Sequence, residues 1–294
     1  MTYPVTQTAQ KVMNNLSKVT TPLNAGLVFD RFTPQKEITE KGYNRNILNK
    51  ILGFFTKSDS ELHTAWIKRW KAMISAQNGQ ILPMRLQWRF LTGVGMNTPL
   101  EVGFAFHRYG FPYLLGSGVK GITRQRYLIK LASDLKISEL DQLDQIMYAN
   151  EGDDLRKAML DKFQKELKDG EYAKCSNFQY LFGTMNRAGK VIFFDAIPGG
   201  NVKLEIDVMT PHFSKHYQKK GPPHDGDNPN PINFLTVAPN TLFYFGVGWR
   251  GELKQSEERS FANIKGILRL ALKELGAGAK TNAGYGFFYE PEEN

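Results

Sequence analysis

Apolar residues recur every three to four positions in two segments near the N-terminus, the spacing of a helix face that packs on a core. One segment runs from residue 43 to 55. The other runs from residue 61 to 76, where Ser60 is a candidate N-cap. The apolar face expected for this second helix comprises Leu62, Trp66, Trp70 and Met73. Its opposite face carries Lys68, Arg69 and Lys71, which fit either a solvated surface or a path for RNA.

Strict alternation of apolar and polar residues predicts strands further along the chain. In residues 84–91, Met84, Leu86, Trp88 and Phe90 alternate with Arg85, Gln87 and Arg89. Residues 241–249 alternate in the same way, and a short strand is expected at 285–289. Residues 191–197 and 202–209 read as a hairpin that turns at Pro198-Gly199-Gly200.

Two further helices complete the expected order of elements. They cover about residues 119–132 and 258–275, and the second carries a basic stripe of Lys265, Arg269 and Lys273. Strand, helix, two or more strands, helix and strand form the βαββαβ plan of the ferredoxin-like, RRM-like α+β fold, an antiparallel sheet with helices on one face. RNA-recognition motifs share this plan and bind RNA through the open face. The standard motif is excluded, because Gly284-Tyr-Gly-Phe-Phe288 follows the second helix and Ala283 replaces the basic residue.

The remaining segments are expected to decorate a single domain that spans residues 1–294. Residues 1–24 are polar and proline-containing, which predicts a flexible arm, and extra helices precede the first strand. Residues 134–180 predict a helical insertion, in which a helix would end at Gly170, and residues 210–235 form a proline-rich loop. The apolar stripe of the insertion would consist of Leu155, Met159, Phe163 and Leu167.

Charge narrows the choice of partner. The formal net charge of the 294 residues is +9 and the isoelectric point is near 9.4, which favours nucleic acid over membrane as the partner, although a basic protein without a polyanion stays possible. The single cysteine, Cys175, excludes an internal disulfide and fits a reducing compartment. No apolar run reaches membrane-spanning length and no signal peptide is evident, so a cytoplasmic location is expected.

A glycine-rich segment, Gly276-Ala-Gly278-Ala-Lys280-Thr281-Asn-Ala-Gly284-Tyr-Gly286, is the clearest candidate for chemistry. Exposed N–H groups in such a turn form a concavity that binds anions, and Lys280 would add a charge for a phosphate. The segment is not a Walker A loop, because Ala279 precedes Lys-Thr, and it is not a dinucleotide fingerprint, because Thr281 replaces the third glycine. It also leads from a helix into a strand, the reverse of both loops.

A second candidate phosphate site lies at the expected start of the helix at 119–132. Gly116, Ser117 and Gly118 would present free N–H groups there, and Lys120 and Arg124 would share one helix face. A simple N-terminal turn is the alternative.

Both segments resemble known sequence motifs. Residues 276–286 look like the C-terminal glycine-rich loop of the RAMP superfamily of CRISPR proteins, and Gly116-Ser-Gly-Val-Lys-Gly-Ile-Thr-Arg124 resembles the helix-start motif of that superfamily. Three further segments narrow the resemblance to the RAMP subunit of type III-B (Cmr) effector complexes that caps the 3′ end of the guide RNA. These are residues 180–195, 207–212 and 228–237. The resemblance covers most of the chain from Leu27 onward.

The resemblance implies a non-catalytic, crRNA-binding subunit of an antiviral ribonucleoprotein, which contacts the target RNA indirectly. Its protein partners would be the backbone RAMP nuclease, the small helical subunit and another RAMP protein. The RNA-binding residues would be Gly116, Ser117, Lys120, Arg124, Gly276, Gly278, Lys280 and Thr281, with no cofactor, metal or catalytic residue.

Two other interpretations remain open. Some RAMP relatives are metal-independent endoribonucleases that process guide precursors through histidine acid–base chemistry, for which His107, His212 and His216 are candidates. A purely structural interaction module is the other. A metal site of His212, His216, His224, Asp225 and Asp227 is not expected, because the prolines among them oppose a ligand-bearing helix and the spacing matches no metal signature.

Overall fold

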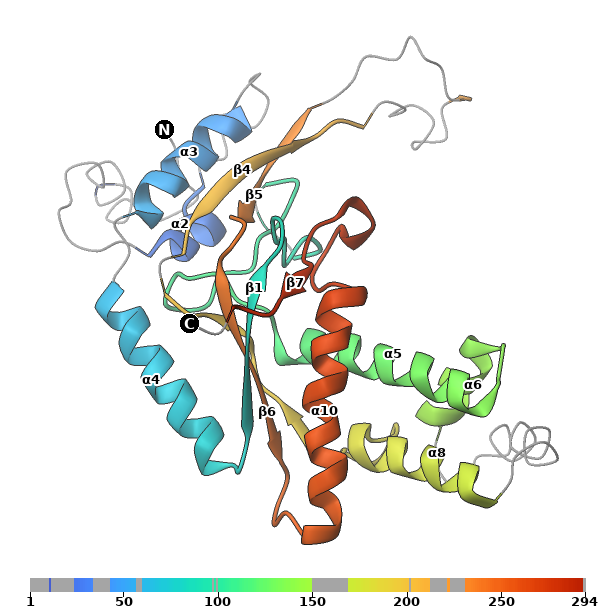
Figure 1. Ribbon diagram of the computed structural model, residues 1–294. Helices are drawn as coiled ribbons and strands as arrows, with labels where there is room; N and C mark the ends of the chain where they lie inside the picture. The colour runs from blue at the N-terminus through green and yellow to red at the C-terminus, as the bar shows by residue number, and fades with distance from the viewer. Residues whose placement is uncertain are drawn as a thin grey trace.

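The computed structural model shows an α+β protein in which helices surround antiparallel β-sheets (Figure 1). It describes residues 11, 24–33, 43–56, 60–96, 98, 100–149, 169–200, 202–211, 221–222 and 231–292. Most of the expected arm at 1–24 and of the proline-rich loop, with His212, His216 and His224, therefore lies outside the described residues. None of the described helices is both long and apolar enough to cross a membrane.

The main sheet is antiparallel, as expected from the sequence. Its strands are β1 (Gln80–Leu86), β2 (Val191–Phe193), β6 (Leu242–Trp249) and β7 (Phe288–Tyr289), in the order β2-β6-β1-β7. A further strand, β3 (Ile197–Pro198), also pairs with β6. The bounds of three predicted strands were partly wrong. The segment 191–197 is split between β2 and β3, and β7 begins at Phe288. The first strand is displaced toward the N-terminus, since β1 runs from Gln80 to Leu86 and not over 84–91.

Two long helices cover one face of this sheet. They are α5 (Gly116–Leu135) and α10 (Gln255–Glu274), which cross each other (Figure 1). Alternate residues of β6 are buried in the core: the ring centre of Phe245 lies 5.2 Å from that of Phe288 of β7, and that of Trp249 lies 5.4 Å from that of Phe261 of α10. The predicted packing of both helices on the antiparallel sheet is therefore confirmed.

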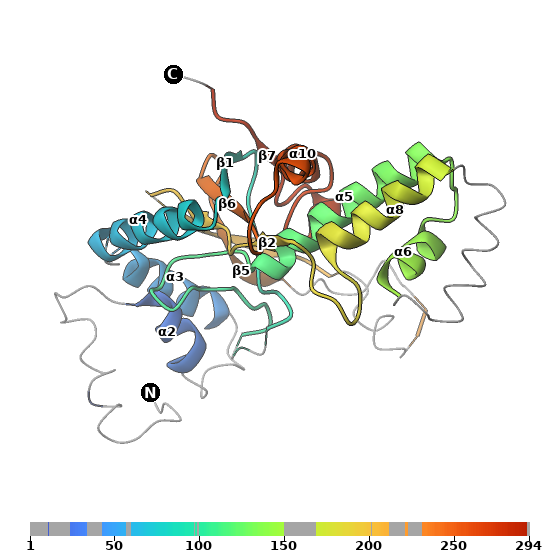
Figure 2. The ribbon, with the colours of Figure 1, turned by 90° about the horizontal axis from the view of Figure 1, so that it is seen from below.

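The opposite face of the sheet is not open. Helix α4 (Ser60–Ala76) packs there through Trp70 and Ile74, which are 2% and 0% exposed (Figure 2 shows α4 across the sheet from α10). A Cβ atom at Gly246 of β6 would approach Ile74 to 2.2 Å, so glycine makes room for this helix. The predicted apolar face was thus partly wrong, because Leu62 and Met73 are 39% and 42% exposed while Ile74 is buried.

A separate two-stranded sheet replaces the predicted hairpin. Strand β4 (Leu204–Met209) pairs antiparallel with β5 (Ile232–Val237), whereas β2 and β3 belong to the main sheet. Residues 198–200 therefore connect two sheets instead of turning a hairpin. The reason is long-range pairing, since β5 lies at the end of the expected proline-rich loop and its alternation was not recognised as a strand.

Of the two N-terminal helices, α3 (Tyr43–Phe55) packs on this second sheet and α2 (Ala25–Arg31) packs on α3. Helix α2 begins at Asn24, whose side chain accepts from Leu27 N–H and donates to the Arg108 carbonyl. Helix α3 matches the predicted segment, and it buries Ile47, Leu48 and Ile51.

The expected insertion is helical where the structure describes it. It contains α6 (Leu140–Tyr148) and α8 (Asp169–Phe182), and Figure 1 shows both beside α5. Gly170 lies at the beginning of α8, so its prediction as a helix end was wrong. The predicted stripe of Leu155, Met159, Phe163 and Leu167 lies outside the described residues.

Candidate nucleic-acid interface

The glycine loop follows α10 and folds back against the segment that leaves β1. Its N–H groups bond to that segment, from Ala279 to the Leu91 carbonyl and from Gly286 to the Arg89 carbonyl, at 2.8 Å each. A short 3₁₀ turn, η2 (Thr281–Ala283), forms the tip. Positive φ angles mark its bends, at Gly276, Gly278, Lys280, Gly284 and Gly286. The loop is therefore a closed, hydrogen-bonded turn.

Two of its glycines are required by the protein's own backbone. A Cβ atom would lie 1.9 Å from the Ala277 carbonyl oxygen at Gly286, and 2.3 Å from the Leu91 carbonyl oxygen at Gly278. Gly284, in contrast, has open space around the same position. The close approach that these glycines permit is thus between parts of the chain itself.

A hydrogen-bonded ion network attaches the loop to the second sheet. Arg89 donates from Nε to Glu205 at 3.0 Å and from Nη1 to Asp207 at 2.8 Å, and the Tyr285 hydroxyl donates to Asp207 Oδ2 at 2.7 Å. Burial acts to raise the pKa of Asp207, but the bonds from Tyr285, Val208 N–H and Arg89 outweigh it and lower the pKa. Burial and the Asp207 carboxylate raise the pKa of Tyr285 to about 12. The network therefore holds Asp207 ionised and Tyr285 protonated at neutral pH.

Lys280 occupies the bend that precedes η2. Its backbone is left-handed at φ 59°, and its Nζ lies 5.8 Å from the centre of the Phe234 ring of β5. Within the described part of the chain, the Lys280 ammonium has no carboxylate partner, and the N–H groups of Lys280 and Thr281 donate no hydrogen bond. These groups are available to an anion at the tip of the loop.

The start of α5 already holds an anionic group. The Gly116 N–H donates to Asp195 Oδ1 at 2.7 Å, and a Cβ at Gly116 would lie 2.3 Å from the Phe193 carbonyl oxygen. The Asp195 carboxylate therefore lies where a phosphate was expected. Like a phosphate, it interacts favourably with the positive N-terminal end of the helix dipole. Ser117, the next residue, is exposed.

Lys120 and Arg124 lie on one face of α5, as the four-residue spacing predicted, but they differ in their surroundings. Arg124 pairs with Asp144 of α6, and its guanidinium carbon lies 5.3 Å from the centre of the Phe178 ring of α8. Lys120 is half-buried, and its pKa is lowered by burial and then by the nearby charges of Arg124 and Arg250. Arg124 thus joins three helices, whereas Lys120 is the cation without a carboxylate partner among the described residues.

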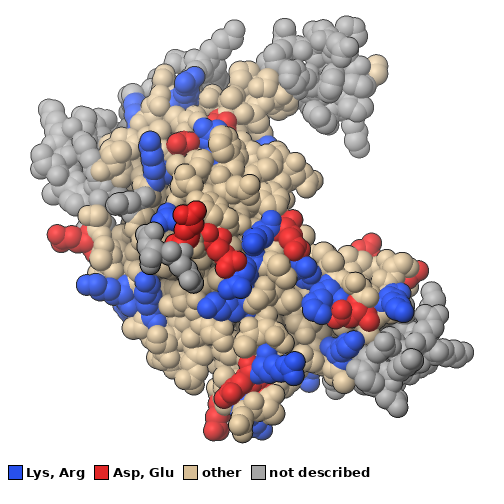
Figure 3. All heavy atoms as spheres, in the orientation of Figure 1, with Lys and Arg blue, Asp and Glu red and all other residues tan. Residues whose placement is uncertain are grey.

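The two motifs face different neighbours. Lys120 lies near Arg250 and Arg124, whereas Lys280 lies over β5, and no contact joins the two lysines among the described residues. Figure 3 shows that basic and acidic side chains are interspersed on the face it presents, without one large basic patch. An RNA that touches both motifs has to extend over the surface between them.

His107 and His63 of α4 belong to an aromatic cluster, and His107 lies near Asp195, the residue that bonds to Gly116 at the α5 start. Both imidazole rings pack on Phe111, each at 4.5 Å between ring centres, and His107 also contacts Trp66 at 5.0 Å. Burial lowers the pKa of His107 to about 4. Its Nδ1 accepts from Tyr109 N–H at 3.3 Å, so the neutral ring carries its proton on Nε2. This ring is neutral and engaged in packing at physiological pH.

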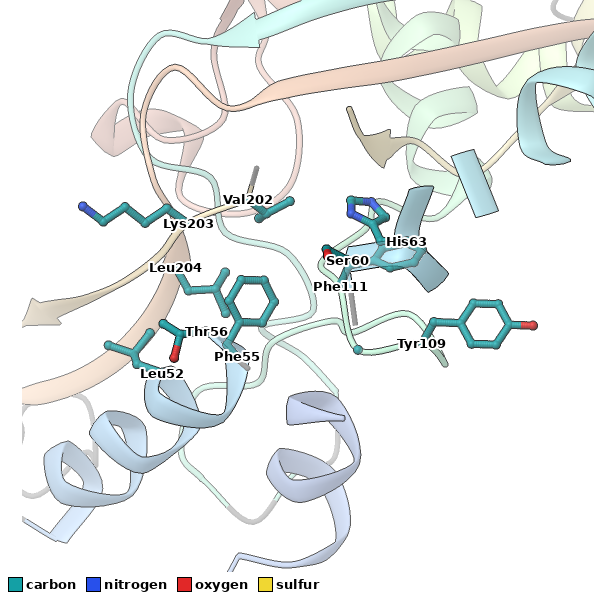
Figure 4. Close-up of a pocket in the computed structure, with 11 residues that line it drawn as sticks. Leu52, Phe55, Thr56, Ser60, His63, Tyr109, Phe111, Val202, Lys203 and Leu204 are labelled. Carbon is teal, nitrogen blue, oxygen red and sulfur yellow. The ribbon is translucent and has the colours of Figure 1, made fainter. Parts of the chain in front are cut away.

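An adjacent cavity of about 450 Å³ lies between α3, α4 and β4 (Figure 4). Its lining is mixed, since apolar Phe55, Phe111 and Leu204 lie beside polar Ser60 and His63, and Tyr109 points away. Residues 57–59 and 201, which adjoin the lining in the chain, lie outside the described residues. Among the described residues, no group of three or more His, Cys, Asp or Glu side chains could hold a metal ion.

Comparison with known proteins explains the two motifs together. The model of the RAMP superfamily matches residues 90–289, which include both the α5 start and the glycine loop. The CRISPR system Cmr subunit Cmr6 of Pyrococcus furiosus is 30% identical over 307 aligned positions, which cover 91% of this chain and 83% of that protein. The chain belongs to the RAMP superfamily, in the Cmr6 family.

Solved structures of Cmr proteins are also similar to this Cmr6 family member. The crystal structure of Cmr6 from Pyrococcus furiosus matches with a TM-score of 0.44 and 31% identity, over 72% of this chain and 97% of that one. A chain in the cryo-EM structure of the type III-B Cmr-β complex bound to cognate target RNA matches with a TM-score of 0.50 and 20% identity, over 97% and 86%. The latter likeness extends the common fold to almost the whole chain.

Several features of this site were not recognisable in the sequence. Asp195 and Asp207 lie far in sequence from the motifs that they touch, Asp195 beside Gly116 and Asp207 beside Tyr285. Both lie in the segments that carry the resemblance, at 180–195 and 207–212, and that was the only signal that could have pointed to them. Their role is to hold the two motifs in place.

Proposed function

We propose that this protein is a crRNA-binding subunit, without catalytic activity of its own, of a type III-B CRISPR ribonucleoprotein that targets foreign RNA. It lies near the 3′ end of the guide, beside the backbone RAMP nuclease, the small helical subunit and another RAMP protein, in the cytoplasm. The observation that carries this proposal is the family match, which spans both motifs, together with a relative named as a Cmr subunit.

The glycine loop is the primary contact with the guide backbone. Lys280 supplies the charge and Thr281 supplies N–H and hydroxyl donors, while Gly276 and Gly278 give the loop its shape. Such contacts position RNA without reading its sequence.

The α5 start is the second contact. Lys120 and exposed Ser117 face the backbone, and Gly116 brings the helix to its place against Asp195. Arg124 forms an ion pair with Asp144, so its charge is neutralised there. It contributes to RNA binding mainly by holding α6 and α8 against α5. Lys120 is therefore the residue of this motif on which a test depends.

The fold supports a ferredoxin-like plan for the single RAMP domain over residues 1–294. The chain order β1-α5-β2-β6-α10-β7 is βαββαβ, and the spatial order β2-β6-β1-β7 has the first and third of these strands at the centre. In this plan residues 134–180 are a helical insertion, residues 210–235 a proline-rich loop, and residues 1–24 an arm.

Binding of single-stranded RNA at several salt concentrations tests the proposal. Lys280→Ala and Lys120→Ala are each expected to weaken binding similarly for unrelated sequences and to reduce the slope of log affinity against log salt by about one. Lys130→Ala is the matched control, because Lys130 is an exposed lysine of α5 that pairs with Asp134 at 2.5 Å. Affinity and slope unchanged in both variants would assign these motifs to packing or to neighbouring subunits.

The competing activity is metal-independent cleavage of guide precursors, and His107 is the candidate within the described residues. His107→Ala, His212→Ala and His216→Ala are expected to leave target cleavage by the assembled complex nearly unchanged, and the isolated protein is expected not to cleave RNA. Loss of cleavage in one of these variants, with assembly intact, would favour the enzyme instead.

A further inference from the structure

Trp88 is the most exposed of the four tryptophans. It is 48% exposed, whereas Trp70 and Trp249 are 2% and 1% exposed and Trp66 is half-buried. It lies two residues beyond β1, where the alternation of apolar residues predicted a buried position. The chain bends at Gln87 and Trp88, where the strand pairing of β1 ends, although Gln87 N–H still bonds to the Phe287 carbonyl at 2.8 Å. A large apolar ring is thus presented to solvent.

The Trp88 ring is supported from one side by a fixed cation. The guanidinium carbon of Arg89 lies 5.1 Å from the ring centre, and its nitrogens are held by Glu205 and Asp207. The Arg89 side chain is only 24% exposed, so it cannot easily leave the ring. A cation over one face of an aromatic ring leaves the other face for a second planar group.

Trp88 is joined to the tip of the glycine loop through a continuous set of contacts. Arg89 contacts Asp207, Asp207 accepts from Tyr285, Tyr285 lies 6.2 Å from Phe234 by ring centres, and Lys280 lies over that Phe234 ring. An aromatic ring lies at one end, and an ammonium without a carboxylate partner in the described part of the chain lies at the other. Such a pair of groups binds single-stranded nucleic acid, in which bases stack and phosphates meet cations. The backbone bond from Gly286 to Arg89 fixes the two ends relative to each other.

We propose that Trp88 is a stacking platform for an unpaired nucleobase of the RNA whose backbone lies along the glycine loop. This inference rests on the proposed RNA-binding function and adds the residue that binds a base. Stacking is open to every base, because each has a π-face, so the platform adds affinity without reading sequence. Arg89 is neutralised by Glu205 and Asp207 and serves to hold the ring, whereas Lys280 has no carboxylate partner among the described residues and supplies the charge for a polyanion, which favours RNA over an apolar protein partner.

Titration of the full-length chain with a single-stranded RNA of about ten nucleotides tests the proposal. Quenching of tryptophan fluorescence is expected to come mainly from Trp88, because Trp70 and Trp249 are buried and Trp66 is half-buried. Trp88→Phe should therefore lose most of the quenching while keeping most of the affinity. Trp88→Ala should bind about tenfold more weakly, within the range measured for loss of one base–aromatic stack. Met185→Ala is the control, since Met185 is an apolar side chain that is 62% exposed.

RNA with single abasic replacements gives the decisive comparison. At one position, removal of the base should weaken binding to the wild-type chain and have little further effect on Trp88→Ala. Wild-type RNA affinity in Trp88→Ala would overturn the platform. If Trp88→Ala kept its RNA affinity but no longer assembled with the partner subunits, Trp88 would instead be a protein-docking residue. A wild-type chain that does not bind RNA at all would instead reject the proposed function itself.

Discussion

The hydroxyl of Tyr285 donates a 2.7 Å hydrogen bond to the carboxylate of Asp207. Tyr285 belongs to the glycine loop, and Asp207 belongs to β4 in the second sheet. The bond therefore joins the last part of the chain to a sheet built from its middle, and together with Arg89 it sets the orientation in which the loop meets solvent.

Removal of this bond tests its contribution to stability. Tyr285→Phe is expected to lower the free energy of unfolding by about 1–2 kcal/mol, because a hydrogen bond to an ionised group is lost while the ring packing on Phe234 is kept. Tyr289→Phe is the control. It removes the exposed bond from Tyr289 to the uncharged Asn240 side chain and should cost less. Equal losses in urea titrations of the two variants would contradict a special role for Asp207.

Substitution of two glycines of the loop distinguishes the cost of a steric clash from the cost of backbone strain alone. Gly286→Ala is expected to destabilise by about 3 kcal/mol or more, because the new Cβ meets the Ala277 carbonyl oxygen at 1.9 Å and φ is +74°. Gly284→Ala meets open space at φ +87° and should cost about 1 kcal/mol, the strain of a left-handed residue alone. Thermal unfolding of both variants gives the comparison, and similar melting temperatures would show that the loop relaxes around the added methyl group.

Arg124 distinguishes RNA contact from the attachment of helices. Arg124→Ala is expected to lower stability by about 1–2 kcal/mol, since it removes the pair with Asp144 and the contact with Phe178. Lys130→Ala, which breaks an exposed pair on the same helix, should cost less than about 0.5 kcal/mol. Per folded molecule, Arg124→Ala should reduce RNA affinity less than Lys280→Ala does. The reverse order would show that Arg124 binds RNA directly.

The buried imidazole of His107 makes stability depend on acid. Its pKa falls from 6.5 to about 4 on folding, so the folded state favours the neutral ring. The stabilisation of the neutral form is present above pH 6.5 and is lost as the pH falls from 6.5 to about 4, because the unfolded chain then binds the proton more tightly. Solvent screening of the half-buried ring limits the loss to about 2 kcal/mol.

His107→Gln should flatten this part of the curve of unfolding free energy against pH. Glutamine can accept the Tyr109 N–H bond that His107 Nδ1 accepts, yet it does not titrate. An unchanged slope in the variant would assign the acid dependence to other groups, such as His63, whose pKa is also lowered by burial.

Local periodicity in the sequence was sufficient for most of the elements. Helix α3 has the predicted bounds, α4 and α10 differ by a few residues, and β6 is nearly as predicted, because each buries one face continuously on a core. The main antiparallel sheet and the two helices on it followed from the order of these elements.

The sequence by itself determined which residues bend the chain and which bear charge, since the left-handed positions of the glycine loop and the identity of Lys280 are local properties. Only the tertiary structure decided what each of them touches. Asp195 fills the α5 start, Arg124 is paired with Asp144, and Trp88 is exposed although the alternation placed it inside. The physical reason is that pairing and burial depend on which distant segments meet. Strand β5 is an example, because it contacts the glycine loop through Phe234 and pairs with β4 from the far end of a long connection.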